Sequence, residues 1–269
     1  MMNTTEEIIP LWPESTAGSP NPYGQEATVP AATGHRDVTF IRNVTEPALN
    51  VHRPDQSRAT GTAVIVCPGG SFVTLTNGTG VAVAKALAAY GFTAFVLRYR
   101  LLPSAPRDED FAKQWANYRM DEIKAQSRVA VADAVRAVQV VREQAPTWDL
   151  DPHRVGVLGF SAGGLLTIGA ATTYDEHSRP DFAAAIYGPP WHEYVVPPDA
   201  PPLFIAFASD DTGEDVVNGN LALYRAWQAA GHSVEMHIYA RGGHGFAMEA
   251  QGLPCDSWMD RFLDWARAG

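Results

Sequence analysis

The sequence predicts an α/β fold in which a mostly parallel sheet is covered by helices on both faces. Short, continuous apolar runs, such as 61–67 and 155–160, are typical of strands that are buried on both sides. Segments with helical periodicity alternate with these runs, as the crossover connections of a parallel sheet require. The 269 residues, 46% of them apolar, are enough to bury one large core.

The predicted domain begins after a proline-rich arm. Residues 1–36 are expected to run extended over the surface, and residues 37–269 to form a single α/β domain. The segments 37–44 and 48–52 are expected to pair as an antiparallel hairpin. Strands are predicted over 61–67, 93–98, 155–160, 182–187, 203–208 and 234–239, the first two of them buried. Helices are predicted over 80–90, with Thr79 as its cap, and over 121–144, 161–172, 221–230 and 257–268. Residues 101–120 break this rhythm and predict an excursion over the sheet.

Charge and composition exclude several classes of function. The net charge is −10 and lysines and arginines form no block, which argues against nucleic acid and anionic membranes as partners. No apolar run approaches the ~18 residues of a membrane span, and no signal peptide is visible, so we expect a soluble, cytoplasmic protein. The two cysteines, Cys67 and Cys255, are too few for a disulfide framework. We expect Cys67 to be a buried free thiol.

A strand–turn–helix segment carries the chemistry. The run 155–160 leads into the pattern Gly159-Phe160-Ser161-Ala162-Gly163, followed by small and aliphatic residues. In a nucleophile elbow a serine sits at the apex of such a turn, and glycines two positions before and after it let neighbouring backbones approach. On its own this pentapeptide is weak evidence for a nucleophile elbow, because an ordinary turn between a strand and a helix can have the same sequence. Its neighbours in the predicted sheet therefore decide the interpretation.

The partners of an acyl-transfer serine follow other predicted strands. The first buried strand ends in Cys67-Pro68-Gly69-Gly70-Ser71-Phe72, and a glycine pair there lets backbone N–H groups turn toward a ligand. His244, in a glycine-rich loop after the last strand, is the candidate base. The acid would come from the loop after 203–208, where Asp210, Asp211 and Asp215 are all within reach. The resulting order along the chain, Ser, then Asp, then His, is the order found in folds that carry a nucleophile elbow.

Other polar residues receive structural interpretations. The acidic cluster at 210–215 would also suit a solvated loop or a loose cation site, but its spacing fits no defined calcium loop, and we expect no metal and no cofactor. Trp191 and His192 follow a strand on the side of the site, where they line the pocket or pack on the surface. Arg98 and Arg100 are expected to form an ion pair with Asp133 or a neighbour.

The chain resembles an α/β-hydrolase of the acetyl xylan esterase-like, carboxylesterase-related group. The likeness extends from the Leu-Trp-Pro segment at 11–13, through 67–72, Tyr99-Arg100 and 159–164, to the histidine loop at 242–246. The resemblance implies Ser161 as nucleophile, His244 as base and Asp211 as acid. It implies an oxyanion hole made by the backbone N–H groups of Gly70, Ser71 and Ala162. We further expect Gly69, Phe72 and Trp191 to contact the substrate.

Two departures from the group matter. Where its members have a third glycine, this chain has Ser71, whose side chain is expected to narrow the acyl pocket. The acid loop at 211–217 is longer than usual, which keeps Asp215 as a rival acid.

We therefore expect a metal-independent serine esterase that acts on short-chain esters, with acetyl esters of sugars as candidate substrates and a small-molecule ester as its partner. One alternative is a peptidase or amidase that uses the same triad, and another is a non-catalytic ligand-binding protein. A glycosidase needs two opposed carboxylates roughly 5–10 Å apart, and the elbow offers no such pair. The oligomeric state does not follow from the sequence.

Overall fold

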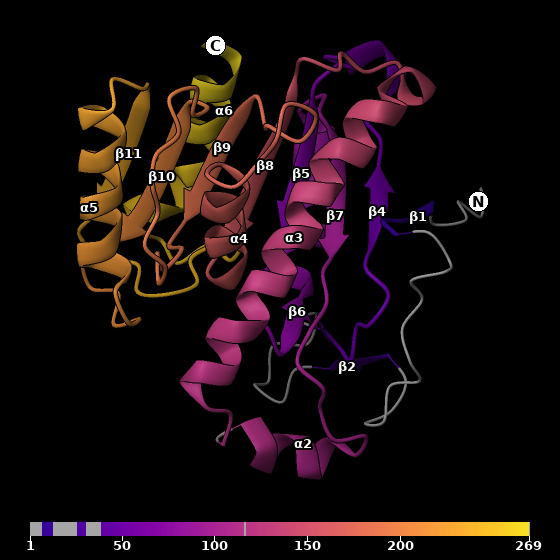
Figure 1. The fold of residues 1–269 in the computed structure, drawn as a ribbon, viewed down its shortest axis with the longest axis vertical. Coiled ribbons are helices and arrows are strands. Elements are labelled where there is room, and N and C mark those ends of the chain that lie inside the picture. The colour runs from indigo at the N-terminus through magenta and orange to yellow at the C-terminus, as the bar shows by residue number, and fades with distance from the viewer. Residues whose placement is uncertain (1–6, 13–25, 31–38, 116, 269) are drawn as a thin grey trace.

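The computed structural model describes residues 7–12, 26–30, 39–115 and 117–268, and these residues form a mostly parallel eight-stranded sheet (Figure 1). The strand order is β1-β4-β7-β5-β8-β9-β10-β11. The strands from β5 onward in this sheet are parallel to one another, whereas β4 is antiparallel to β7 and β1 to β4. The bounds are β1 Ile8–Pro10, β4 Ala48–His52, β5 Ala63–Cys67, β7 Thr93–Arg98, β8 Val155–Phe160, β9 Phe182–Ile186, β10 Leu203–Ala208 and β11 Val234–Tyr239. The predicted fold class is confirmed.

Helices cover both faces of the sheet. In Figure 1, α3 and α4 cross in front of the strands and α6 lies behind them. Alternate residues of β5 divide between the two sides: Val64 and Val66 join one buried cluster, and Ala63, Ile65 and Cys67 join the other. This period of two is why a continuous apolar run makes a strand that is buried on both faces. The helices are α1 Val81–Ala89, α2 Asp108–Trp115, α3 Met120–Gln144, α4 Ala162–Ala170, α5 Val216–Ala229 and α6 Trp258–Ala268.

The predicted antiparallel hairpin is wrong. β3 (Thr39–Arg42) pairs with β2 (Ala27–Pro30) and β6 (Thr74–Thr76) in a separate three-stranded sheet, whereas β4 joins the main sheet. The connection contains Asn43 at a φ of 59°, and its buried side chain accepts hydrogen bonds from the backbone N–H and hydroxyl of Ser104. The chain is therefore held at this point by the 101–105 segment, which a local turn signal does not reveal.

The described parts of the N-terminal arm are extended, and each forms the edge strand of a sheet. β1 lies at the edge of the main sheet and β2 at the edge of the small one. The remainder of the predicted arm lies outside the described residues.

A buried arginine anchors the excursion between β7 and α3. Arg42, 2% exposed, donates hydrogen bonds to the carbonyls of Ala105 and Pro106 and to the carboxylate of Asp108, at the start of α2. Its guanidinium also lies 5.0 Å from the centre of the Phe111 ring. The excursion is thus fixed to β3, and it contains a helix that the sequence analysis did not predict.

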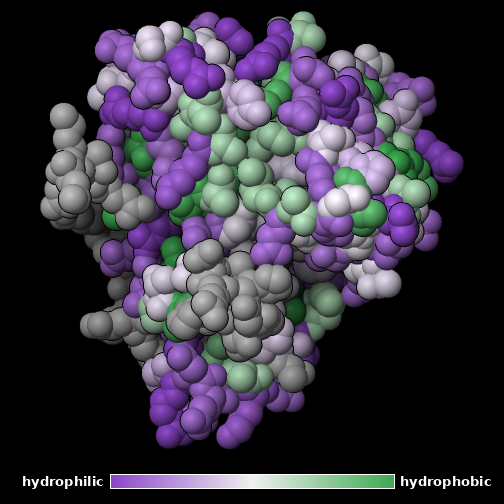
Figure 2. All heavy atoms as spheres, turned by 180° about the vertical axis from the view of Figure 1, so that it is seen from behind, coloured by the Kyte–Doolittle hydropathy of each residue, from purple (hydrophilic) through white to green (hydrophobic). Residues whose placement is uncertain are grey.

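The rear face of the molecule carries hydrophilic side chains around its margin and a gathering of weakly apolar ones in its upper half (Figure 2). Within the described ranges, no helix is both long and apolar enough to cross a bilayer.

A buried carboxylate links the first described segment to the core. Asp133 of α3 is fully buried and accepts hydrogen bonds from the Trp12 indole, the Arg100 backbone N–H and the Arg100 guanidinium, at 3.0, 3.0 and 2.7 Å. The expected pairing of Arg100 is confirmed, whereas Arg98 pairs with Glu26 instead. Removing the charge of Asp133 leaves the guanidinium without its counter-ion.

We predict that Asp133→Asn lowers the free energy of unfolding by about 2 to 3 kcal/mol, because a fully buried carboxylate loses its charge-assisted hydrogen bonds to the partly exposed Arg100 guanidinium and to the Trp12 indole. Urea denaturation followed by circular dichroism measures this. The matched control is Asp110→Asn, which breaks a pair with Arg107, a side chain that is 78% exposed. The control is expected to cost less than about 1 kcal/mol. Equal losses in both variants would contradict the anchoring role of Asp133.

Candidate active site

Ser161 lies at the turn between β8 and α4, with φ 53° and ψ −119°. A non-glycine residue in this region is strained, and the surroundings must hold it there. A Cβ atom at Gly163 would come within 1.9 Å of the Cys67 carbonyl oxygen, and one at Gly159 within 2.0 Å of the Gly163 oxygen. The glycines of the motif therefore permit the close approach of three backbone segments around the serine.

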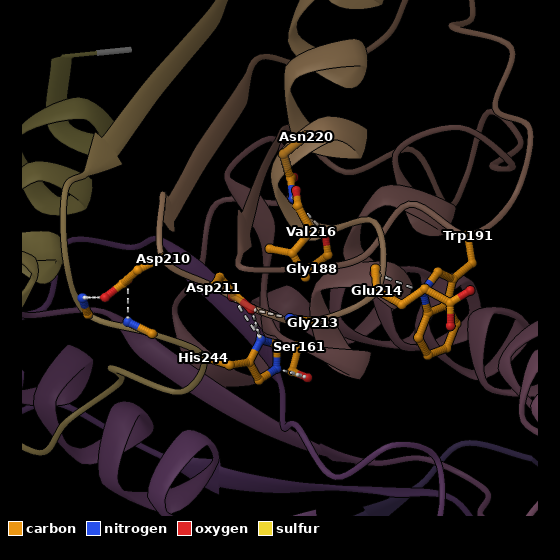
Figure 3. Close-up of polar contacts among 12 residues, drawn as sticks. Ser161, Gly188, Trp191, Asp210, Asp211, Gly213, Glu214, Val216, Asn220 and His244 are labelled. Carbon is orange, nitrogen blue, oxygen red and sulfur yellow. Dashed lines mark hydrogen bonds and ion pairs between the residues drawn. The ribbon is translucent and has the colours of Figure 1, made fainter.

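The His244 imidazole lies between Ser161 and Asp211 (Figure 3). Its Nε2 is 2.7 Å from the Ser161 Oγ, and its Nδ1 is 2.9 Å from the nearer Asp211 carboxylate oxygen. The Asp211 side chain is fully buried and also accepts a hydrogen bond from the Gly213 backbone N–H. With the imidazole neutral, Nδ1–H donates to the carboxylate and Nε2 is free to accept the hydroxyl proton.

The rival acids occupy other positions. The Asp210 carboxylate accepts hydrogen bonds from the backbone N–H groups of Gly243 and Gly242, at 2.8 and 3.4 Å, and so braces the loop that carries His244. Asp215 is exposed, has a φ of 60° and directly precedes α5. In the structure, Asp211 is therefore the acid that contacts His244.

The glycine loop after β5 packs directly beside Ser161. A Cβ atom at Gly69 would lie 3.4 Å from the Ser161 Cβ. Gly70 has a φ of 135°, and a Cβ there would lie 2.1 Å from the Thr74 carbonyl oxygen, so only glycine fits. Among the described residues, no acceptor takes the backbone N–H of Gly70 or Ser71. The Ala162 N–H, at the start of α4, is one of the helix's unsatisfied first donors.

Two side chains and one backbone N–H group hold this loop. The Tyr99 hydroxyl donates to the Pro68 carbonyl at 2.8 Å, and the Leu102 N–H donates to the Phe72 carbonyl at 2.8 Å. Thr79, predicted to cap the helix that follows, makes no such cap. Its hydroxyl oxygen accepts the Gly69 N–H at 2.9 Å, because α1 begins later, after Gly80. The threonine thus braces the loop instead of the helix.

The three residues expected to contact the substrate differ in their exposure. Gly69 lies against Ser161, but its backbone N–H and carbonyl are occupied by Thr79 and Thr76. Phe72 is fully buried and packs against Trp191, with ring centres 6.3 Å apart, so its side chain is covered by the protein. Trp191 is half-buried, and its indole N–H is 3.4 Å from the Glu214 carbonyl oxygen.

The neighbouring His192 contacts helix α3. Its Nε2 lies 2.8 Å from the Ser127 hydroxyl of α3. Burial, followed by the positive charges of Arg128 and Lys124, lowers the pKa of His192. Within the described residues, no cluster of three or more His, Cys, Asp or Glu side chains could hold a metal ion.

Two residues behind the site were not predicted from the sequence. Tyr187, directly after β9, packs its ring against that of His244. Asn220 of α5 is fully buried, and its amide N–H groups donate to the carbonyls of Gly188 and Val216 (Figure 3). The sequence carried a signal for Tyr187, because this tyrosine precedes a glycine at the end of a strand. It carried none for Asn220, because an asparagine within a helix is more often exposed.

Known proteins resemble this chain. An acetylxylan esterase from Xylanibacter ruminicola is 27% identical over 240 residues, which cover 77% of this chain and 46% of the relative. The chain therefore spans about half the length of that relative. Among solved structures, an acetyl ester-xyloside bifunctional hydrolase from Caldicellulosiruptor lactoaceticus superposes with a TM-score of 0.70 at 24% identity, over 98% of this chain and 96% of its own. The butyrate-bound esterase 2 of Thermogutta terrifontis gives a TM-score of 0.63 at 18% identity, over 84% and 90%.

A third structural neighbour is MGS-M1, an α/β hydrolase from a deep-sea metagenome. It has a TM-score of 0.65 at 20% identity, over 91% of this chain and 97% of its own. These structural neighbours share the fold of this chain.

The family follows from a sequence match, since the model of the dienelactone hydrolase family matches residues 50–260. This range holds the glycine loop, the elbow, the acid loop and the histidine loop, and the chain belongs to the dienelactone hydrolase family.

Proposed function

We propose that the protein is a serine hydrolase that cleaves short-chain carboxylic esters, with acetyl groups on sugars as its substrates. The observation that carries the proposal is the continuous chain of contacts from the Ser161 hydroxyl through His244 to the buried Asp211 carboxylate. Beside it lies the glycine loop, in which the backbone N–H groups of Gly70 and Ser71 have no acceptor among the described residues. These are the parts that acyl transfer through a covalent serine intermediate requires.

The geometry suggests a two-step reaction. His244 Nε2 takes the proton of the Ser161 hydroxyl while the oxygen attacks the ester carbonyl carbon. The backbone N–H groups of Gly70, Ser71 and Ala162 would stabilise the negative oxygen of the tetrahedral intermediate. His244 then gives its proton to the departing alcohol, which leaves an acyl-enzyme. A water molecule, activated by the same imidazole, releases the carboxylic acid and restores the serine.

Three features support a small acyl group on a sugar. Ser71 replaces the third glycine of similar loops, its backbone has a φ of 55°, and we propose that its side chain narrows the acyl pocket. The acetylxylan esterase of X. ruminicola and the acetyl ester-xyloside hydrolase of C. lactoaceticus are named for this type of substrate. The half-buried Trp191 ring packs on Phe72, which follows the glycine loop, and we propose that this ring contacts the sugar.

The first prediction concerns substrates. We expect hydrolysis rates to fall from p-nitrophenyl acetate to butyrate to octanoate, because a narrow acyl pocket excludes long chains. We also expect acetate release from acetylated xylo-oligosaccharides. Ser161→Ala should lower turnover by at least about 10³-fold with an unchanged circular dichroism spectrum, because the nucleophile is lost. Aryl-ester turnover without sugar activity would remove the sugar from the proposal, and undiminished activity in Ser161→Ala would overturn it.

The second prediction separates the acids. Asp211→Asn should lower kcat about 10⁴-fold, since an amide cannot hold the imidazole in its productive tautomer or stabilise its charged form. Asp215→Asn, which changes an exposed neighbour on the same loop, is the matched control and should retain activity close to that of the wild type. Steady-state kinetics on p-nitrophenyl acetate measure both. The reverse ranking would transfer the role of acid to Asp215.

The third prediction concerns the glycine loop. Thr79→Val keeps the side-chain shape but removes the acceptor of the Gly69 N–H, so the loop loses one of its braces. We expect kcat to fall about 10- to 100-fold, because misplacement of a catalytic group by about 1 Å costs up to this much. Thr79→Ser keeps the hydroxyl and should retain most activity. If Thr79→Val kept wild-type kcat, the brace would be unimportant for catalysis.

A further inference from the structure

The end of β9 contacts Ser161, His244 and the helix that follows the acid loop. The Ile186 carbonyl accepts the backbone N–H of Ser161 at 3.0 Å. The Tyr187 ring centre lies 5.0 Å from the centre of the His244 ring. The Gly188 carbonyl accepts an N–H from Asn220 at 2.8 Å, and the same amide group donates to Val216, where α5 follows the acid loop (Figure 3). Three consecutive residues thus contact the nucleophile, the base and the element behind the acid.

Tyr187 is held in a strained conformation at this strand end. Its φ is 39°, which is uncommon for a residue with a bulky side chain. Its backbone N–H continues the sheet by donating to the Ala206 carbonyl at 2.7 Å, and the residue is 1% exposed. Backbone strain of this kind persists only where the surroundings impose it, and it collects at functional sites.

The ring, not the hydroxyl, contacts the histidine. The planes of Tyr187 and His244 meet at 60° in an edge-to-face arrangement, and Phe246 packs on Tyr187 with centres 4.9 Å apart. The Tyr187 hydroxyl is buried, and no described residue is its hydrogen-bond partner. Burial, followed by the negative charge of Asp211, raises the pKa of this phenol, so it stays neutral. The contribution of Tyr187 to the site is therefore the packing of its buried ring against the His244 ring.

The Tyr187 ring restrains the orientation of the His244 ring, which the glycine-flanked backbone of His244 does not restrain. His244 stands between Gly243 and Gly245, which have φ values of 60° and 102°, and its side chain is 37% exposed. Hydrogen bonds at the two imidazole nitrogens, to Ser161 and Asp211, restrain the line that joins the two partners. They leave the ring free to rotate about that line. A buried ring packed against the imidazole opposes that rotation.

We propose that Tyr187 is a positioning residue that fixes the plane of the His244 imidazole for proton transfer from Ser161. This inference rests on the proposed function of the triad but names a residue outside it. Because the same strand end accepts the Ser161 N–H through Ile186, the nucleophile and the base are placed by one rigid element. An error in the imidazole plane changes the reacting geometry without changing the pocket. It therefore affects kcat and leaves KM nearly unaltered.

The test compares three variants of the full chain. Tyr187→Leu removes the ring, and kcat on p-nitrophenyl acetate should fall about 100-fold with little change in KM. Tyr187→Phe keeps the ring and should restore kcat to near the wild-type value. Phe95→Leu is the matched control: Phe95 is fully buried and packs on Trp148 in the core, with centres 5.0 Å apart. It should lower Tm as Tyr187→Leu does and leave kcat unchanged.

A second measurement is independent of the choice of ester. A fluorophosphonate probe labels an activated serine, and its rate constant should fall about 100-fold in Tyr187→Leu alone. Wild-type labelling without turnover of any ester would contradict the proposed substrate, and the labelling rates would still decide the role of Tyr187. Wild-type kcat and labelling in Tyr187→Leu would overturn the inference. An equal loss in Phe95→Leu would do so too, and loss in Tyr187→Phe would refute the assignment to the ring.

Discussion

The positive φ of Ser161 is the constraint on which the rest of the site depends. A serine in this conformation directs its side chain away from both the strand and the helix that it joins. The turn is stable only because other backbones pack against it at distances that no side chain would allow, as at Gly163. Its own N–H finds an acceptor in Ile186 of the neighbouring strand. Contacts with the sheet therefore stabilise the strained backbone of Ser161, and they fix the position of the serine without a bound ligand.

The parallel strands then determine what surrounds the serine. β5 and β9 flank β8, so the glycine loop and Tyr187 leave the sheet on either side of the elbow. Farther along, β10 and β11 end in the loops of Asp211 and His244. Each loop is braced by groups from outside it: Tyr99 and Thr79 hold the glycine loop, and Asp210 holds the histidine loop. Polar side chains at strand ends thus convert flexible, glycine-rich segments into fixed ones.

The sequence was sufficient for features that local patterns encode, and insufficient for pairings between distant segments. The apolar runs and the order of the motifs predicted the parallel sheet and the serine and histidine that meet at its edge. They left three candidate acids, and the family resemblance favoured Asp211. The partner of β3 was not predictable, because Asn43 is held by Ser104, sixty-one positions away. Thr79 was assigned to the helix beside it, whereas its real partner is Gly69 across the loop. Phe72 stood beside the glycine pair in sequence, and only the fold turned its ring inward.

Two fully buried carboxylates show how differently the fold can use one chemical group. Asp133 faces a permanent cation, the Arg100 guanidinium, together with donors from Trp12 and the backbone, so its charge is compensated at all times. Among the described residues, Asp211 is contacted by the Gly213 N–H and the His244 imidazole and by no guanidinium or ammonium group. A buried negative charge without a cation is costly, and it favours whatever brings positive charge beside it. In the proposed reaction, transfer of the Ser161 proton to His244 brings this positive charge, and we propose that the carboxylate with weaker compensation supports catalysis for this reason.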